Sequence, residues 1–584
     1  MAFQPALAIN DPSGLPHPRR VRRATLPGAM TATAAVVTAI TLAGCGGGTT
    51  SVSTNLACDA LTTGALAIPG LKVASAVNVA AKTDGATGGD NYPAHCRVQG
   101  SINDRIGIDA KPYAIGYEVR LPATWNGKFF FQGGGGTNGV LVPAVGNLLN
   151  SSTSNALSQG YAVASTDGGH NTGQSDVGFG LDPQARADYG YNAVGTLTPA
   201  AKQIIARTYG RSPERSYFMG CSNGGRDAMV AATRFADQFD GMVAANPGFN
   251  LPKAAIAQQW DTQQFMSATT AAGQLPKDAF PQSVMNAVAN GILAKCDALD
   301  GAVDGMVNNR SACQSAFNLA NDVPTCTSTP DGTCVSATQK SALLKIFAGP
   351  KNTAGQSLYA TWPWDPGIAG ANWRFWKLDT GFAPLPFNTL IGASAMGYVF
   401  TTAPDVPNLA DGGLGYQMRF SMDTDAPKIS ARTATFKESA IDFMAPPNAT
   451  QLSALKARGG KLIVYHGTAD PVFSPDDSVA WYNAVNAGDS KAPDYTRLFL
   501  VPGMNHCNGG PATDRFSMLP VLENWVERGV APDSVVAGVN PADPDVIAKG
   551  WSAKRTRPLC AYPKQATLKP GATDLESAAS FVCQ

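Results

Sequence analysis

A serine lies in a sequence pattern that can turn its hydroxyl into a nucleophile. The segment Gly220-Cys221-Ser222-Asn223-Gly224 follows a short apolar run and precedes a helix-like segment, residues 226–235. In this pattern a sharp turn between strand and helix exposes the serine hydroxyl, and the glycines leave room for the turn. We therefore predict that Ser222 attacks a carbonyl carbon. An ordinary glycine-rich turn is the alternative interpretation.

A serine nucleophile needs a histidine as base and an acid that orients the histidine. In α/β hydrolases the chain order is serine, acid, histidine, and among the histidines only His466 and His506 follow Ser222. Asp470 lies on the loop after one strand-like run, and His506 lies on the loop after the next. We predict Ser222 as nucleophile, His506 as general base and then acid, and Asp470 as its orienting partner. We interpret His466 as structural.

Acyl transfer also needs backbone donors for the negative oxygen of the tetrahedral intermediate. The N–H of Asn223, directly after the nucleophile, is one expected donor. Gly136, in the glycine-rich loop of residues 133–139 after an earlier strand, is the second, although a flexible turn is the alternative. His170 either lines the pocket or forms a loop hydrogen bond. His95, beside Cys96, is interpreted as structural.

Three carboxylates lie in a short segment rich in glycine. Asp297, Asp300 and Asp304 alternate with glycines that permit tight turns, and side-chain and backbone oxygens are ligands that Ca²⁺ prefers. The spacing is not that of an EF-hand. The segment lies far from Ser222 in sequence, so we expect a structural ion, with an ordinary Asp-Gly turn as the alternative.

The N-terminus has the features of an export signal. A basic region is followed by an apolar run, residues 29–43, which is too short to span a bilayer. The run ends in Leu-Ala-Gly-Cys45, which resembles a bacterial lipobox and predicts a lipid on Cys45. An ordinary secretory signal is the alternative. We predict a signal at residues 1–45, a flexible tether at residues 46–57, and a periplasmic, outer-membrane-anchored or secreted protein.

The cysteine count supports export. Ten of the 11 cysteines remain after Cys45, and an even number in an exported protein indicates disulfides. Cys221 and Cys507 adjoin Ser222 and His506, so a hydrogen bond between those two residues allows the cysteines to approach within disulfide distance. Local spacing and position favour the remaining pairs, Cys58–Cys96, Cys296–Cys313, Cys326–Cys334 and Cys560–Cys583.

The elements that must position these residues alternate between strands and helices. Short apolar runs at residues 128–132, 161–165, 216–219, 241–245, 461–465 and 497–501 end in glycine-rich or polar loops. This rhythm predicts an α/β fold, a parallel sheet flanked by helices. Residues 249–450 lack the rhythm and hold four cysteines. We therefore predict a catalytic domain at 58–248 and 451–584, with an inserted lid domain at 249–450.

The overall composition excludes several classes of function. The chain has 584 residues and a net charge of +1, so it lacks the basic excess of a nucleic-acid binder. No stretch after the signal is long and apolar enough for a membrane span, so we expect membrane contact only through a lipid on Cys45. We expect a monomer that acts on a small substrate.

Together these motifs resemble the tannase and feruloyl esterase family, from about residue 58 to residue 583. The resemblance implies an α/β-hydrolase core with a large lid, hydrolysis of esters of aromatic acids, and a disulfide beside the triad. It implies that Trp376 and Phe473 pack against the aromatic ring of the acid. It also implies that Ca²⁺ in the lid is bound by side chains and carbonyls of five residues: Asp297, Asp300, Ala302, Asp304 and Met306.

The residues expected to contact the acid part of the ester differ from those in one branch of the family. Members that hydrolyse terephthalate monoesters hold the free carboxylate with a lid arginine, but residues 384–398 contain no Arg or Lys, and Phe387 matches that position. Arg374 and Lys377 are the nearest cations in sequence. We predict a serine esterase for feruloyl or galloyl esters. The alternatives are a terephthalate monoester as substrate, or a lipoprotein that binds aromatic compounds without catalysis.

Overall fold

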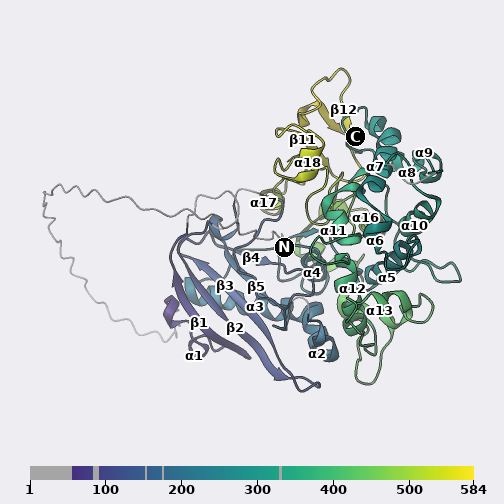
Figure 1. The fold of residues 1–584 in the computed structure, drawn as a ribbon. Coiled ribbons are helices and arrows are strands. Elements are labelled where there is room, and N and C mark those ends of the chain that lie inside the picture. Colours follow the sequence, from purple (N-terminus) through teal and green to yellow (C-terminus); the bar gives the residue numbers. More distant parts are fainter. Residues whose placement is uncertain (1–54, 83–90, 152–153, 174–175, 328–331) are drawn as a thin grey trace, which may run out of the picture. The chain divides into compact units, whose positions relative to one another are not determined.

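The computed structural model of the protein has a nine-stranded sheet at its core (Figure 1). The structure describes residues 55–82, 91–151, 154–173, 176–327 and 332–584. The predicted signal at residues 1–45, its Cys45 and most of the tether at residues 46–57 lie outside the described residues. Residues 55–584 form one unit.

The strands of the main sheet are β1 (Leu71–Val79), β2 (His95–Ile106), β3 (Pro112–Pro122), β4 (Lys128–Gln132), β5 (Ala162–Thr166), β6 (Arg215–Cys221), β7 (Gly241–Ala245), β8 (Lys461–Gly467) and β9 (Thr496–Val501). Their order is β1-β2-β3-β5-β4-β6-β7-β8-β9. Neighbours from β5 to β9 run parallel, so the predicted parallel sheet is confirmed there.

The first three strands make the sheet mixed rather than parallel. β1, β2, β3 and β5 pair antiparallel with one another in that order. Only a short connection, residues 107–111, joins β2 to β3, and a connection of that length cannot carry the chain back for a parallel pair. The predicted α/β fold with a parallel sheet flanked by helices is confirmed, and these antiparallel strands extend that sheet at one edge.

Helices cover both faces of the parallel strands. In β4, Phe129 and Phe131 lie in one apolar core beneath helices on one face of the sheet, whereas Phe130 lies in a second core beneath a helix on the other face. Successive side chains of a strand point to opposite faces, so a run of apolar residues can fill both cores. The helices outside the insertion are α1 (Thr63–Leu66), α2 (Pro183–Ala187), α3 (Ala193–Tyr209), α4 (Asn223–Arg234), α15 (Ser453–Arg458), α16 (Pro475–Gly488), α17 (Met518–Arg528) and α18 (Pro544–Ala548).

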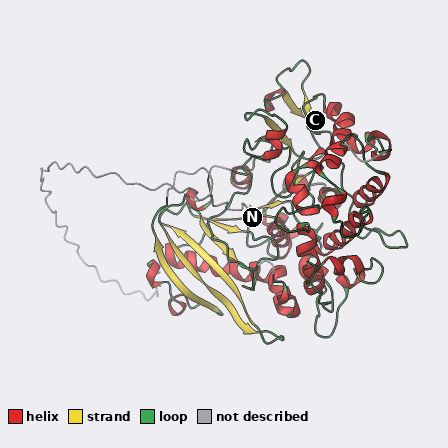
Figure 2. Ribbon diagram, in the orientation of Figure 1, coloured by secondary structure: helices red, strands yellow, loops and turns green. Residues whose placement is uncertain are grey.

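The segment between β7 and β8 is mainly helical (Figure 2). It supplies most of the side chains in two apolar cores, which residues of the surrounding sheet domain such as Phe179 and Phe473 complete. The exact boundaries of a lid domain at residues 249–450 stay a prediction. The helices of the segment are α5 (Leu251–Ser267), α6 (Pro276–Ala279), α7 (Gln282–Cys296), α8 (Arg310–Ala316), α9 (Leu319–Asp322), α10 (Ala337–Phe347), α11 (Ala371–Lys377), α12 (Phe387–Ala395), α13 (Leu414–Arg419) and α14 (Ala440–Met444).

Disulfides and two small sheets complete the unit. The structure contains the five predicted disulfides, and the last one, Cys560–Cys583, joins two strands of the small sheets. The small sheets pair β10 (Ser534–Gly538) with β11 (Thr556–Cys560), and β12 (Ala566–Leu568) with β13 (Phe581–Cys583).

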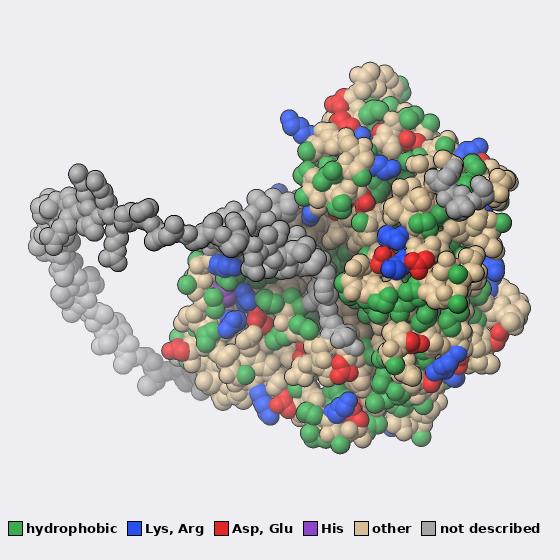
Figure 3. Space-filling model, viewed as in Figure 1, with side chains coloured by type: hydrophobic (Ala, Val, Ile, Leu, Met, Phe, Trp, Pro, Cys, Tyr) green, Lys and Arg blue, Asp and Glu red, His purple; other side chains and the backbone are tan. Residues whose placement is uncertain are grey.

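The surface is mixed in charge. On the face that Figure 3 shows, Lys and Arg are scattered among Asp and Glu, as expected from the net charge of +1. Within the described part of the chain, every helix is too short or too polar to cross a bilayer.

Candidate active site

Ser222 lies at the sharp turn between β6 and α4. Its φ of 63° and ψ of −123° are a strained conformation for a residue with a side chain. The glycines on either side are needed because of close backbone contacts: a Cβ on Gly220 would lie 2.5 Å from the backbone of Gly224. The local pattern therefore produces the exposed turn that the sequence predicts for a nucleophile.

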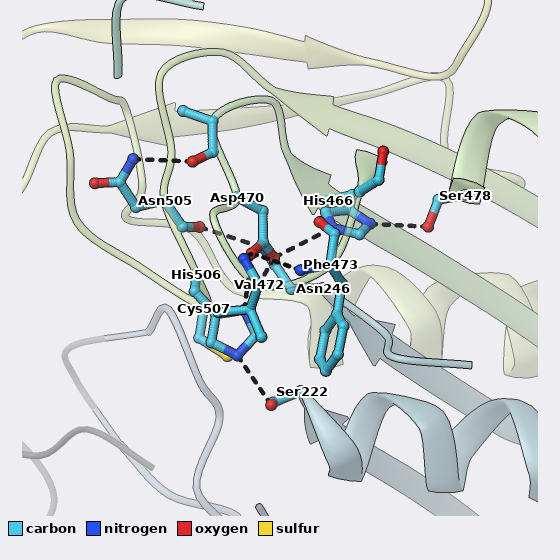
Figure 4. A network of polar contacts seen from close by, with 12 residues as sticks. Ser222, Asn246, His466, Asp470, Val472, Phe473, Ser478, Asn505, His506 and Cys507 are labelled. Carbon is cyan, nitrogen blue, oxygen red and sulfur yellow. Dashed lines mark hydrogen bonds and ion pairs between the residues drawn. The ribbon is translucent and has the colours of Figure 1, made fainter. Parts of the chain in front are cut away.

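His506 lies between Ser222 and Asp470 (Figure 4). The hydroxyl oxygen of Ser222 is 2.9 Å from Nε2 of His506, and Nδ1 of His506 is 2.9 Å from Oδ2 of Asp470. Asp470 is fully buried, and His506 is 5% exposed. The Cys221–Cys507 disulfide, with 6.0 Å between its Cα atoms, joins the neighbours of the serine and the histidine. The arrangement has the hydrogen-bonded order of a serine hydrolase triad.

Two side chains that the sequence analysis did not place in the site also contact Asp470 (Figure 4). Asn246, directly after β7, donates from Nδ2 to Oδ2 of Asp470 at 2.7 Å. His466, in β8, lies with its Nε2 at 3.2 Å from the same oxygen. The N–H groups of Val472 and Phe473 donate to Oδ1 at 2.7 and 3.1 Å. Both carboxylate oxygens are therefore well supplied with donors.

These donors keep Asp470 ionised. Burial by itself raises the pKa of this carboxyl, but the charge of His506 and the hydrogen bonds from His466 and His506 outweigh burial and hold the pKa well below its usual range.

The sequence contains a signal for both Asn246 and His466, which the sequence analysis did not place in the site. Asn246 ends a strand next to that of the nucleophile, and ligand-binding residues gather at such strand ends. His466 lies four residues before Asp470.

The glycine-rich loop after β4 packs against the nucleophile turn. A Cβ on Gly224 would lie 2.4 Å from the carbonyl oxygen of Gly134, so a larger residue would push the two segments apart. Gly136 has a φ of 56°, and its carbonyl accepts a hydrogen bond from the hydroxyl of Tyr189 at 3.0 Å. Asn223 is the first residue of α4, where an N–H has no acceptor within the helix. The backbone N–H groups of Gly136 and Asn223 remain the predicted oxyanion donors.

Aromatic rings border the histidine. The ring centroids of Trp376, on α11, and Phe473, after β8, lie 5.1 and 5.4 Å from that of His506. Phe387, the first residue of α12, packs against Trp376 at 4.9 Å. The two predicted substrate-binding residues are thus next to the candidate base. Flat apolar walls of this kind suit an aromatic ring.

The two nearby cations already have partners. Lys377 is buried and forms an ion pair with Asp261. Arg374 donates to the carbonyl oxygen of Phe280 at 3.0 Å, and its guanidinium lies 3.8 Å from the carboxylate of Asp379. A carboxylate on the substrate would have to compete with these contacts for either cation.

Residues 297–306, which we call the acidic loop, form hydrogen bonds mainly within the loop and with β11. Asp297 accepts a hydrogen bond from the N–H of Asp304 at 3.1 Å, and Asp300 accepts one from the N–H of Ala302 at 3.0 Å. Asp304 forms an ion pair with the buried Arg557. Burial raises the pKa of Asp300 to about 6. Within the described ranges, no three His, Cys, Asp or Glu side chains form a group that could hold a metal ion.

Two further histidines have local roles. Nε2 of His170 lies 2.8 Å from the carbonyl oxygen of Thr137, and its ring stacks on that of Phe179 at 3.9 Å. Burial lowers the pKa of His170 to about 4, so it is neutral near pH 7. Of the two interpretations of His170, the structure therefore supports a loop hydrogen bond. Nδ1 of His95 lies 2.8 Å from the carbonyl oxygen of Pro93.

The fold and this site define an α/β hydrolase with a serine–histidine–aspartate arrangement. Residues 96–584 match the family described as tannase and feruloyl esterase, and the chain belongs to that family. The resemblance seen in the sequence is thereby confirmed.

Relatives and a solved structure agree with this assignment. The chain is 40% identical to mono(2-hydroxyethyl) terephthalate hydrolase of Piscinibacter sakaiensis over 91% of this chain and 92% of that protein. It is 30% identical to a probable feruloyl esterase of Arthroderma benhamiae, over 82% and 83% of the two chains. Feruloyl esterase B from Aspergillus oryzae has the same fold, with a TM-score of 0.69 at 24% identity, over 88% and 97%.

Proposed function

We propose that the protein hydrolyses esters of aromatic acids through an acyl-enzyme on Ser222. The observation that carries this proposal is the hydrogen-bonded line from Ser222 through His506 to Asp470, with the rings of Trp376 and Phe473 next to the histidine. A flat acyl ring packed against these aromatic rings brings its ester carbonyl next to the serine.

The reaction proceeds in two steps. The oxygen of Ser222 attacks the ester carbonyl carbon while its proton passes to Nε2 of His506, and the N–H groups of Gly136 and Asn223 bind the oxyanion. The bond to the alcohol oxygen breaks, and His506 gives that oxygen its proton. Water then attacks the acyl carbon and gives a proton to His506, which returns it to Ser222 as the acid leaves. Asp470 stabilises the imidazolium in both steps.

The acid that fits this site best carries no second charge. Phe387 adds an apolar ring beside Trp376, and both Arg374 and Lys377 are paired with other groups. A carboxylate without a free cation would lose its hydration without compensation. We therefore favour feruloyl or galloyl esters. The second candidate is a terephthalate monoester, which the 40% identity to a hydrolase of such an ester favours.

A comparison of three substrates separates the candidates. The values of kcat/KM for methyl ferulate, methyl gallate and mono(2-hydroxyethyl) terephthalate are measured under identical conditions with Ca²⁺ present. A tenfold preference for ferulate or gallate, about 1.4 kcal/mol in the transition state, supports the phenolic esterase. The same preference for the terephthalate monoester contradicts it and points to Arg374 or Lys377 as a cation released for the substrate.

A serine-directed fluorophosphonate probe separates the esterase from a protein that only binds aromatic compounds. We expect the wild type to be labelled and to hydrolyse these esters. Ser222→Ala loses both properties without a change in thermal stability, because its hydroxyl bonds only within the site. Ser534→Ala, at an exposed position of β10, is the matched control and keeps both. Ester hydrolysis by Ser222→Ala at the wild-type rate would disprove the assignment.

We propose that the acidic loop binds a structural Ca²⁺ ion. The donor set supports this, because the carboxylates of Asp297, Asp300 and Asp304 and the carbonyls of Ala302 and Met306 are all oxygen ligands within one short loop. The negative charge of Asp304 raises the pKa of both Asp297 and Asp300, beyond the larger effect of burial, so added positive charge would relieve this repulsion and stabilise the loop. The ion takes no part in the ester chemistry.

We propose that the protein is exported and works as a monomer on a small ester. The five disulfides support export, since such bonds persist in oxidising compartments. Mass spectrometry of the wild type and of Cys45→Ala tests for the lipid. A wild-type protein without added lipid mass contradicts the anchor and leaves an ordinary secretory signal.

A further inference from the structure

A row of aromatic side chains leads from the histidine of the site to the protein surface. Trp376 lies 5.1 Å from His506, and Phe387 lies 4.9 Å from Trp376, measured between ring centroids. Phe375 lies 5.1 Å from Phe387, and Phe382 lies 6.2 Å from Phe375. We call Trp376, Phe387, Phe375 and Phe382 the aromatic strip.

The strip runs from partly buried rings near the histidine to an exposed ring at its outer end. Trp376, Phe375 and Phe387 are partly exposed, and Phe382, in the loop between α11 and α12, is 73% exposed. A single exposed aromatic ring is ordinary, but a contiguous row of them beside a reactive group marks a binding surface. The spacings between these rings lie in the range in which aromatic pairs attract each other, so an added ring would find edges and faces to pack against.

The strip is also free of available charge. Two cations share α11 with Phe375 and Trp376, but Lys377 is buried in its ion pair with Asp261, and Arg374 is held by Phe280 and Asp379. An uncharged aromatic group on a ligand would therefore gain binding energy from the strip, whereas an anionic group would find no unpaired cation on α11. The occupant must also lie next to the reacting ester, because the strip begins at Trp376.

We propose that the aromatic strip binds a second aryl ring of the ester substrate. The first ring lies beside His506, and the second lies on Phe375 and Phe382. The protein then prefers esters that carry two aromatic rings along one extended molecule. This inference rests on the proposed esterase function, because the occupant is part of the substrate. The strip begins at Trp376, which also borders His506. We therefore identify its occupant as part of the substrate and not as a separate partner.

The test compares three esters that differ only at the far end of the acid. They are methyl ferulate, its 4-O-benzyl ether and its 4-O-cyclohexylmethyl ether. The benzyl and cyclohexylmethyl groups have nearly the same size, but only the benzyl group is aromatic. The enzymes are the wild type, Phe382→Ala, Phe382→Leu and the control Val536→Ala, which removes an exposed apolar side chain of β10.

We expect Phe382→Ala to lower kcat/KM for the benzyl ether about fivefold, the size of one lost aromatic pair. The loss appears in KM rather than kcat, because a ring remote from the ester binds equally in the ground state and the transition state. Methyl ferulate and the cyclohexylmethyl ether are affected less than twofold. Phe382→Leu behaves as Phe382→Ala does, and Val536→Ala behaves as the wild type does.

Three results would overturn the inference. One is an unchanged kcat/KM of Phe382→Ala for the benzyl ether. Another is an equal loss on methyl ferulate, which would mean that the loop only supports the site. The third is an equal loss on the cyclohexylmethyl ether, which would mean that the surface is apolar without selecting aryl groups. Failure of the proposed function looks different, since the wild type would then hydrolyse none of the three esters and would not react with a fluorophosphonate.

Discussion

We predict that His466 adjusts the basicity of His506 through their shared partner, Asp470. Nε2 of His466 faces two acceptors, Oδ2 of Asp470 at 3.2 Å and the carbonyl oxygen of Phe473 at 3.1 Å, so it carries a hydrogen. Nδ1 of His466 lies 2.8 Å from the hydroxyl oxygen of Ser478. His466 therefore draws part of the negative charge of Asp470 away from His506.

Two substitutions separate this donor from the rest of the side chain. His466→Asn places its amide near the position of Nδ1, which keeps a partner for Ser478 and removes the donor to Asp470. His466→Gln places its amide nitrogen at about the reach of Nε2 and keeps that donor. Both variants retain a polar side chain at a fully buried position, so neither leaves an empty apolar cavity.

The expected magnitude follows from the contacts. A hydrogen bond to a charged group contributes about 1.5–3 kcal/mol, and the lower end applies because Phe473 shares this N–H. About 1.5 kcal/mol corresponds to about one pH unit, and loss of this donor moves the pKa of Asp470 upward. Asn246 and two backbone N–H groups still bind the carboxylate, so only part of the change reaches His506. We expect the acid limb of the pH profile of His466→Asn to move to higher pH by about half a unit.

The assay is kcat/KM against pH for a soluble aryl ester, from about pH 5 to about pH 9. The acid limb reports the pKa of the base in the free enzyme, so in His466→Asn it moves to higher pH while the alkaline plateau is nearly kept. His466→Gln keeps the wild-type limb. The reasoning is refuted if His466→Asn loses activity equally at all pH values, or if both variants shift the limb alike. Melting temperatures of both variants control for a loss of folding.

Three further predictions concern stability. Ca²⁺ raises and a chelator lowers the melting temperature of the wild type but not of Asp297→Ala; a wild type indifferent to both contradicts the calcium site. Burial raises the pKa of Asp167 to about 7, above its unfolded value of 3.8, so folding stability is lost as the pH rises through this range. Asp167→Asn removes that loss, and an unchanged dependence of melting temperature on pH would count against it. Replacing both Cys221 and Cys507 by Ser lowers stability by about 2–5 kcal/mol and lowers kcat more than it raises KM, because the disulfide holds the serine and histidine loops together. Wild-type kcat in the double variant contradicts this role.

Much of the parallel core is predictable from local sequence. The apolar run at residues 128–132 coincides with β4, and the run at residues 241–245 coincides with β7. These strands are buried on both faces, so nearly every residue in them is apolar and the run stands out. β1 to β3 were missed because the apolar residues in them are interrupted by polar or exposed residues, as the burial pattern of β1 shows. Their pairing depends on neighbours that a local pattern does not include.

Some parts of the candidate site are likewise predictable from local sequence, and other parts are not. The serine turn is visible in the sequence because its steric demands act between near neighbours, such as Gly220 and Gly224. The surroundings of Asp470 are not visible, since Asn246 reaches it across 224 residues of sequence. His466 is close in sequence, but only the direction of its ring shows that it contacts the carboxylate rather than filling the core.

The sequence by itself predicted the candidate nucleophile, the order of the candidate triad, the disulfide partners and the family. These features depend on residue types at short spacing, or on a chain order that the chemistry requires. Only the tertiary structure decided which donors bind Asp470, which cations are already paired and where the aromatic strip leads. Those contacts join the ends of different strands and the helices inserted between them, and the folding of the whole chain brings them together.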